Sequence, residues 1–180
     1  MSLSIIKLKS KDSSIYEVTE NIAKQSGLLK NLLDLENIEQ KGDNDVIPLY
    51  EVDSKTLELI IKWCSYHEND DDDAKFFNNG NKKNYNNDDE LYYKTNNRKL
   101  SLWDQKFLNE LQINTLINLI NAANYLNIEH LLDISCNFIA NSVIKGKSPE
   151  ELRTIFQIED DLSPEEKIRI EKENEWCQKV

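Results

Sequence analysis

Glycine is scarce in this chain of 180 residues, which limits the binding sites that it can build. Only four glycines occur, and they stand far apart at positions 27, 42, 80 and 146. A loop that cradles phosphate groups needs closely spaced glycines, because the backbone amides must approach the ligand without hindrance from side chains. The sequence therefore predicts no nucleotide-binding loop of the G-x-G-x-x-G or Walker type.

Basic residues and long apolar runs are also lacking. Lys and Arg together number 22 against 33 Asp and Glu, which gives a net charge of -11. Nucleic-acid binding relies on basic patches that neutralise phosphates, and an anionic membrane surface repels an acidic protein. No apolar run approaches the length of about 18 residues that a membrane-spanning helix requires. We therefore expect neither nucleic acid nor membrane as a partner.

Cysteines are few, odd in number and widely spaced. Cys64, Cys136 and Cys177 are typical of reduced thiols rather than of a disulfide framework. The first residues lack the apolar core and the small-residue cleavage site of a signal peptide. These two observations favour a cytoplasmic and nuclear location.

The two histidines give no sign of a catalytic or metal site. His67 and His130 each stand alone near the end of an expected helix, so we expect surface positions or interactions with helix dipoles. Cys136 lies in an apolar helical pattern, where a thiol is expected to be buried and inert. We therefore predict no enzyme activity, no metal and no cofactor. A cysteine-dependent hydrolase is the alternative, and it would need an accessible thiol beside a histidine.

The N-terminal third alternates between strand and helix patterns. Residues 4 to 18 predict two short strands around a polar turn, because apolar and charged residues alternate there. A helical pattern follows from Thr19 to Leu33, and residues 46 to 49 predict a third short strand. Asp53 or Ser54 is expected to cap a helix that continues to about His67.

Residues 68 to 100 interrupt this order. The segment holds eight asparagines between positions 78 and 97, and it shows no sustained apolar period. A structureless stretch of this length is uncommon within a compact domain. We therefore predict a disordered insertion between two folded parts.

Two helices with unusual surfaces are expected next. Residues 115 to 126 are apolar except for a stripe of Asn118, Asn121 and Asn124, which is either a plain solvent face or a contact surface. Residues 128 to 145 are apolar on two sides of one helix, which indicates that other elements cover both sides. Part of that cover is expected to come from another polypeptide.

The C-terminal segment contains two helix starts. The tetrapeptide SPEE occurs at 148 to 151 and again at 163 to 166. In each copy Ser can cap the helix, Pro can occupy its first position and Glu can complete a capping box. The last helix is expected over residues 165 to 180; it is charged and short, yet it carries Trp176 and Cys177 near its end. Those two side chains either pack on the protein's own domain as a lid or serve as an exposed anchor for a partner.

Six motifs in this order resemble one known family. They are NIAKQSGLLKNLL, LELIIKWCSYH, LWDQKFL, NAANYLNIEHLLDISCNFIAN, IKGKSPEELRTIF and RIEKENEWCQKV. Together they resemble the S-phase kinase-associated protein family, the adaptor subunits of SCF-type cullin-RING ubiquitin ligases. The resemblance covers about residues 3 to 67 and 101 to 178 and leaves the asparagine-rich segment outside.

The resemblance implies an α+β fold and a function without catalysis. It implies a BTB/POZ domain over residues 1 to 145, with the insert at about 68 to 100, and a helical F-box-binding extension over residues 146 to 180. Members of the family bridge a cullin scaffold to F-box proteins, which hold substrates for ubiquitin-dependent degradation. The resemblance assigns cullin contacts to Ile117, Asn121, Asn124 and Tyr125. It assigns F-box contacts to Cys136, Ile139, Leu152, Phe156, Trp176 and Cys177.

Two departures and one rival accompany this interpretation. Asn121 stands where the family pattern leads us to expect an aliphatic residue, which would weaken or alter cullin contact. The segment CNFIANSVIKGK is one residue longer than the pattern, so the helix register there is open. The rival is a self-associating BTB/POZ scaffold outside ubiquitin ligation, and a weak homodimer of the free protein is compatible with either function. Favouring the family also favours the anchor interpretation of Trp176.

Overall fold

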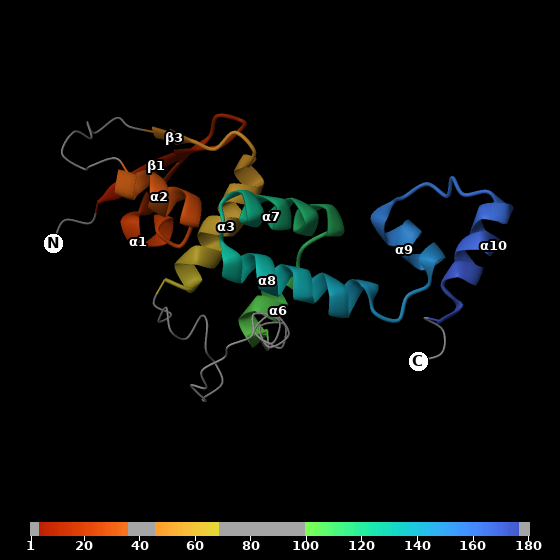
Figure 1. Ribbon diagram of the computed structural model, residues 1–180. Helices are drawn as coiled ribbons and strands as arrows, with labels where there is room; N and C mark the ends of the chain where they lie inside the picture. Colours follow the sequence, from red (N-terminus) through yellow and green to blue (C-terminus); the bar gives the residue numbers. More distant parts are fainter. Residues whose placement is uncertain (1–3, 36–45, 69–99, 177–180) are drawn as a thin grey trace, which may run out of the picture. The chain divides into compact units, whose positions relative to one another are not determined.

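The computed structural model describes residues 4–35, 46–68 and 100–176, which form two compact units, 1–145 and 146–180 (Figure 1). The predicted disordered insertion lies almost wholly outside the described residues, as does Cys177. None of the helices in these ranges combines the length and the low polarity that crossing a membrane requires.

A small mixed sheet opens the first unit. Strands β1 (Ile5–Lys9) and β2 (Ile15–Thr19) pair antiparallel, and β3 (Val46–Pro48) pairs parallel with β1, so the strand order is β2-β1-β3. Ile6 and Leu8 are buried while Lys7 between them and Lys9 after them are not, as the alternation predicts. The predicted hairpin and third strand are confirmed.

The helical pattern after Thr19 is divided into two helices, α1 (Glu20–Ala23) and α2 (Gly27–Leu35). Thr19 caps α1 as expected, with its hydroxyl accepting from the amide of Ile22 at 3.4 Å. The helical pattern is interrupted at Ser26. The Ser26 hydroxyl accepts a hydrogen bond from the amide of Leu29 at 3.2 Å and so caps the start of α2. The spacing of apolar residues in the sequence did not reveal this interruption, because the helical pattern runs on from Thr19 to Leu33.

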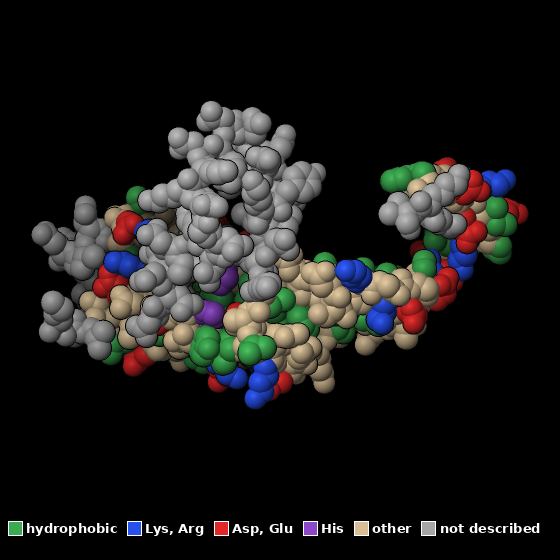
Figure 2. All heavy atoms as spheres, turned by 90° about the horizontal axis from the view of Figure 1, so that it is seen from below, with side chains coloured by type: hydrophobic (Ala, Val, Ile, Leu, Met, Phe, Trp, Pro, Cys, Tyr) green, Lys and Arg blue, Asp and Glu red, His purple; other side chains and the backbone are tan. Residues whose placement is uncertain are grey.

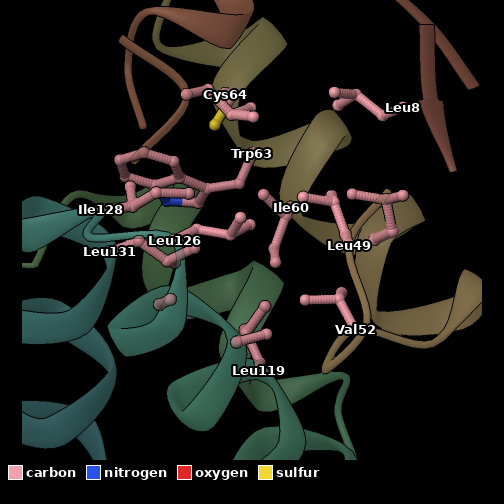
Figure 3. Close-up of a cluster of buried hydrophobic side chains, with 14 of the residues drawn as sticks. Leu8, Leu49, Val52, Ile60, Trp63, Cys64, Leu119, Leu126, Ile128 and Leu131 are labelled. Atoms are coloured by element: carbon pink, nitrogen blue, oxygen red, sulfur yellow. The ribbon is translucent and has the colours of Figure 1, made fainter. Parts of the chain in front are cut away.

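Five further helical segments occur among the described residues of this unit: α3 (Ser54–Tyr66), α6 (Leu102–Asn109), α7 (Ile113–Tyr125), α8 (Glu129–Phe138) and a π-helical segment η2 (Ile139–Ile144). Asp53 caps α3 through a 2.9 Å hydrogen bond from the Thr56 amide. Helices α7 and α8 run side by side (Figure 1), and α3 packs against α7. The core lies between the sheet and these helices (Figure 3). Figure 3 labels Leu8, Leu49, Val52, Ile60, Trp63, Cys64, Leu119, Leu126, Ile128 and Leu131.

A buried carboxylate joins α3 to α6. Asp104 Oδ1 accepts a 2.9 Å hydrogen bond from Trp63 Nε1 and lies 3.0 Å from His67 Nε2, while Ser101 Oγ donates to Oδ2 at 2.7 Å. Asp104 and His67 are both buried, which makes this pair a polar centre within the core. The expectation of a surface position for His67 was therefore wrong.

The two histidines are also close together. The His130 ring lies 5.8 Å from the His67 ring and 5.4 Å from the Trp63 ring, measured between centroids. His130 belongs to α8, so packing of α8 near the end of α3 brings together residues that are far apart in sequence. Spacing along the chain cannot show such a contact, and the predicted isolation of the histidines was wrong.

The second unit consists of α9 (Pro149–Phe156) and α10 (Pro164–Glu173). Ser148 and Ser163 each form the predicted capping box, so both helix starts are confirmed. The last helix is shorter than predicted and ends at Glu173, after which Asn174 donates from its side chain to the Ile170 carbonyl at 2.8 Å. Neither helix contains a buried residue. Figure 2 shows acidic and basic side chains interspersed with hydrophobic ones over this unit.

The Asp104 carboxylate gives a prediction on stability and pH. Burial raises the pKa of Asp104, but hydrogen bonds from His67, Ser101 and Trp63 outweigh burial and hold that pKa below its ordinary value. A carboxyl whose pKa is lower in the folded chain stabilises the fold above the unfolded pKa of about 3.9, and this stabilisation is lost as the pH falls through the folded pKa. Asp104→Asn should lower the free energy of unfolding by about 2 to 4 kcal/mol at pH 7.

Urea unfolding of both proteins between pH 7 and pH 3 measures this effect. The difference between wild type and Asp104→Asn should shrink below about pH 4. Glu110→Gln, an exposed change at the end of the same helix, is the control and should stay within about 0.5 kcal/mol of wild type. A difference between wild type and Asp104→Asn that is constant over the whole pH range would contradict the role of the charged carboxylate.

Gly27 gives a second prediction. It is the first residue of α2 and lies against the end of α7. A Cβ atom at this position would lie 2.3 Å from Asn127 Nδ2 and 3.2 Å from the Asn127 carbonyl oxygen. Gly27→Ala should therefore cost about 1 to 2 kcal/mol of unfolding free energy despite the higher helix propensity of alanine. Adding Asn127→Gly should recover part of the loss, since residue 127 has a φ of 53° that glycine adopts freely. Thermal unfolding of the single and double variants measures both steps, and equal stability of Gly27→Ala and wild type would contradict the close contact.

Candidate interaction surfaces

Helix α7 presents a polar stripe to solvent. Asn118, Asn121 and Asn124 are all exposed, whereas the opposite face is buried through Leu116, Leu119, Ala122 and Ala123. The pattern of the sequence therefore gives the orientation of this helix correctly. A stripe of amides beside partly covered apolar side chains can serve as a protein contact.

The four residues expected to contact a cullin all lie on α7. Asn121 and Asn124 are exposed, and Ile117 and Tyr125 are half-buried. Tyr125 packs partly against the core, so its ring position is tied to the fold. The structure thus brings these residues onto one helix, with the two asparagines fully available to solvent.

Hydrogen bonds from the N-terminal helices fix the end of α7. The Leu126 carbonyl accepts from Ser26 Oγ at 2.5 Å and from the Leu28 amide at 3.2 Å, and the Asn127 carbonyl accepts from the Gly27 amide at 3.0 Å. Asn127 adopts a left-handed conformation, which ends the helix. Because these bonds follow Tyr125 directly, they hold the end of the asparagine stripe in place.

Helix α8 has one buried side and one exposed side. Leu131, Ile134, Ser135 and Phe138 are buried, whereas Cys136 is exposed. The expectation that Cys136 lies in the core was wrong, because the buried stripe runs through positions three and four residues apart that do not include it. The predicted cover on both sides is not seen within the described residues, since the outer side carries the exposed Cys136 and the half-buried Leu132.

The segment with one extra residue forms a π-helix. In η2 the Lys145 amide donates to the Ala140 carbonyl, five residues earlier, at 3.0 Å. This wider turn accommodates one more residue than an α-helical turn. Ile139 and Val143 still pack partly against the core, so the additional residue does not turn them into solvent. Ile139, expected to contact an F-box, lies at the start of this segment.

In the second unit, apolar side chains remain accessible. Leu152 and Phe156 of α9 are half-buried, and Trp176 is 71% exposed. Three further apolar residues were not among the predicted contact residues, although their position among charged neighbours was a signal. They are Ile158, Ile168 and Ile170, which are 60%, 56% and 40% exposed. Exposed apolar side chains on a small acidic unit are typical of a protein-binding surface.

The described residues offer little material for other chemistry. Within residues 4–35, 46–68 and 100–176, no group of three or more His, Cys, Asp or Glu side chains could hold a metal ion. The surfaces on α7, on α8 with η2, and on the second unit are suited to contacts with other proteins.

Comparison with known proteins decides the family. The model of the Skp1 family tetramerisation domain matches residues 4–69, and that of the Skp1 family dimerisation domain matches residues 129–177. A Skp1-related protein of Caenorhabditis elegans is 39% identical over 180 residues, which cover 96% of this chain and 91% of the relative. The chain belongs to the Skp1 family. Its membership confirms the resemblance drawn from the six motifs.

Fungal relatives extend the match within the Skp1 family. The E3 ubiquitin ligase complex SCF subunit sconC of Neosartorya fischeri is 43% identical over 177 residues, covering 98% of this chain and 99% of the relative. The protein with the same description in Talaromyces marneffei is 38% identical over 174 residues, covering 96% of both. The Skp1-type POZ region coincides with the sheet and helices β1 to α3, so the predicted α+β class is confirmed.

The exposed Cys136 gives a testable prediction. Burial and the nearby Asp133 carboxylate raise the pKa of the Cys136 thiol, so little thiolate is present at pH 7. Labelling of Cys136 by a thiol reagent should be slow at pH 7 and should accelerate about tenfold per pH unit without a plateau below about pH 9. Cys64 is buried and should react only on unfolding. Peptide mass mapping distinguishes the sites, with Cys136→Ser as control, and fast labelling of Cys136 at pH 7 would contradict the raised pKa.

Proposed function

We propose that the protein is a non-catalytic adaptor of an SCF-type E3 ubiquitin ligase, which bridges a cullin scaffold to F-box substrate receptors. The observation that carries the proposal is the second unit, where α9 and α10 contain no buried residue and Trp176 is 71% exposed. An indole of this exposure can gain on the order of 2 to 3 kcal/mol from burial against a partner. The SCF subunits among the relatives support the ligase context.

The cullin contact is proposed for α7. Asn121, Asn124, Ile117 and Tyr125 form the contact, with the asparagines at its exposed side. The polar character of Asn121 makes this surface more hydrophilic than an aliphatic residue would. The hydrogen bonds to Leu126 and Asn127 support a rigid surface that changes little on binding.

The F-box contact is proposed for the two-sided helix and the C-terminal helices. Cys136 and Ile139 contribute from the first unit, and Leu152, Phe156 and Trp176 contribute from the second, with Cys177 outside the described residues. Tryptophan is enriched among residues that dominate binding energy, so we assign Trp176 the largest share. Because α9 and α10 bury so little, they open readily in the free protein and become ordered on binding.

A catalytic role is not part of this proposal. A cysteine nucleophile needs a lowered pKa, whereas the pKa of Cys136 is raised and Cys64 is buried in the core. His67 is held by Asp104 within the core rather than exposed to a substrate. We further propose a BTB/POZ domain in residues 1–145, an F-box-binding extension in residues 146–180, and a cytoplasmic and nuclear location.

Self-association is the competing function. The family models that match this chain are described as a dimerisation domain and a tetramerisation domain. These descriptions support a homodimeric scaffold as the alternative. Gel filtration of the purified chain with an F-box domain distinguishes the two. A heterodimer supports the adaptor, and a homodimer that ignores the F-box domain supports the scaffold.

Trp176→Ala tests the two-surface adaptor. In affinity purification of tagged protein, this variant should lose F-box proteins by at least about tenfold while it retains the cullin, because only one surface is altered. Tyr50→Ala, a change at a residue of 70% exposure in the first unit, is the matched control and should retain both partners.

The reciprocal change addresses α7. Asn124→Lys together with Tyr125→Ala should lose the cullin and retain F-box proteins, while Asn114→Lys at the other end of the helix should lose neither. Loss of both partners from Trp176→Ala, or of neither, would tell against two separate surfaces.

A further inference from the structure

One carboxylate in the second unit bridges its two helices. Asp160 lies in the link between α9 and α10, with Lys167 Nζ 2.5 Å from its Oδ2 and Arg153 Nε 3.7 Å from its Oδ1. Arg153 belongs to α9 and Lys167 to α10. Among the ion pairs in the described residues of this unit, those of Asp160 alone connect the two helices; the others join residues of the same helix.

The surroundings of this carboxylate favour a defined position. The hydrogen bond from Lys167, with the added charge of Arg153, lowers the pKa of Asp160, which shows that both cations favour its charged form. The Arg153 side chain is only 22% exposed, and its backbone carbonyl accepts from the Ile158 amide at 2.8 Å. Gln157 adopts a left-handed conformation with a φ of 55°, which ends α9 and turns the link towards α10.

Apolar packing between the two helices is limited, because Leu152 and Phe156 are only half-buried. No residue of α9 or α10 is buried, and Ile168 and Ile170 are 56% and 40% exposed. Hydrophobic packing normally fixes how two helices lie against each other. Where hydrophobic packing is limited, polar contacts in the link have a larger share in holding the arrangement.

We propose that Asp160 is a positioning residue that increases the share of free molecules in which α9 and α10 are already paired as an F-box domain needs them. The inference rests on the proposed adaptor function and deepens it. A binding surface that is already arranged loses less conformational freedom on association, which increases affinity without a direct contact to the partner. Because the ion pairs are partly exposed, salt screens them, and their contribution decreases with ionic strength.

Asp160→Asn tests the proposal, with Asp161→Asn as the matched control. Asp161 is the adjacent exposed carboxylate, and the described residues provide no ion-pair partner for it. The affinity for a purified F-box domain, measured by calorimetry at 50 mM NaCl, should fall roughly three- to tenfold for Asp160→Asn and less than about twofold for Asp161→Asn. At 500 mM NaCl the difference between Asp160→Asn and wild type should largely disappear.

A double-mutant cycle separates positioning from a general loss of structure. Lys167→Gln should weaken binding to a similar extent, and the variant that combines it with Asp160→Asn should bind no worse than either single variant. Asp160→Glu, which keeps the charge, should retain most of the affinity. Additive losses, or a loss for Asp160→Asn that persists at 500 mM NaCl, would overturn the inference, as would wild-type affinity of Asp160→Asn.

Hydrogen exchange in the free chain keeps this inference distinct from the proposed function. Amides of residues 149–173 should exchange faster in Asp160→Asn than in Asp161→Asn, since the pair of helices opens more often. If the wild-type chain does not bind the F-box domain, the adaptor function fails, and the exchange experiment alone decides whether Asp160 holds the helices. Equal exchange in the two variants would then overturn its positioning role.

Discussion

The first unit depends on a single buried carboxylate and on the donors that surround it. Burying a charge is costly unless hydrogen bonds replace the lost water, and Asp104 receives them from Trp63, His67 and Ser101. Trp63 and His67 belong to the end of α3, whereas Ser101 and Asp104 begin α6. The network therefore joins the sheet-containing half of the unit to its helical half, on either side of residues 69–99.

The position and exposure of the candidate cullin surface on α7 follow from how α7 packs in the core of the first unit. The end of α7 is held by α2 through the carbonyl groups of Leu126 and Asn127, and a Cβ atom at Gly27 would press against Asn127. The asparagine stripe needs no special chemistry of its own. The stripe is exposed because Leu119 and its apolar neighbours bury the opposite face of α7 in the core. The second unit differs in principle, because no residue of α9 or α10 is fully buried and the ion pairs of Asp160 connect the two helices.

Local patterns predicted whatever depends on neighbours in the sequence. The strand alternation at Ile6 and Leu8, and the capping boxes at Ser148 and Ser163, arise within a few residues and were foreseen. The fate of His67 and Cys136 was not, since each depends on how helices pack rather than on helix periodicity. The break between α1 and α2 has the same cause, because its partners lie about a hundred residues away along the chain. The candidate contact residues came from family resemblance, and the structure adds how exposed each of them is except Cys177, which lies outside the described residues.

The three tryptophans of this chain occupy three different settings, and this gives the protein built-in optical probes. Trp63 is 1% exposed and forms a hydrogen bond with a carboxylate. Trp103 stacks with the rings of Tyr66 and Phe107. Trp176 is 71% exposed. Indole emission shifts to shorter wavelength when water leaves its surroundings. The red edge of the emission spectrum therefore belongs mainly to the C-terminal indole, so a complex formed there carries its own fluorescent signal without any attached dye.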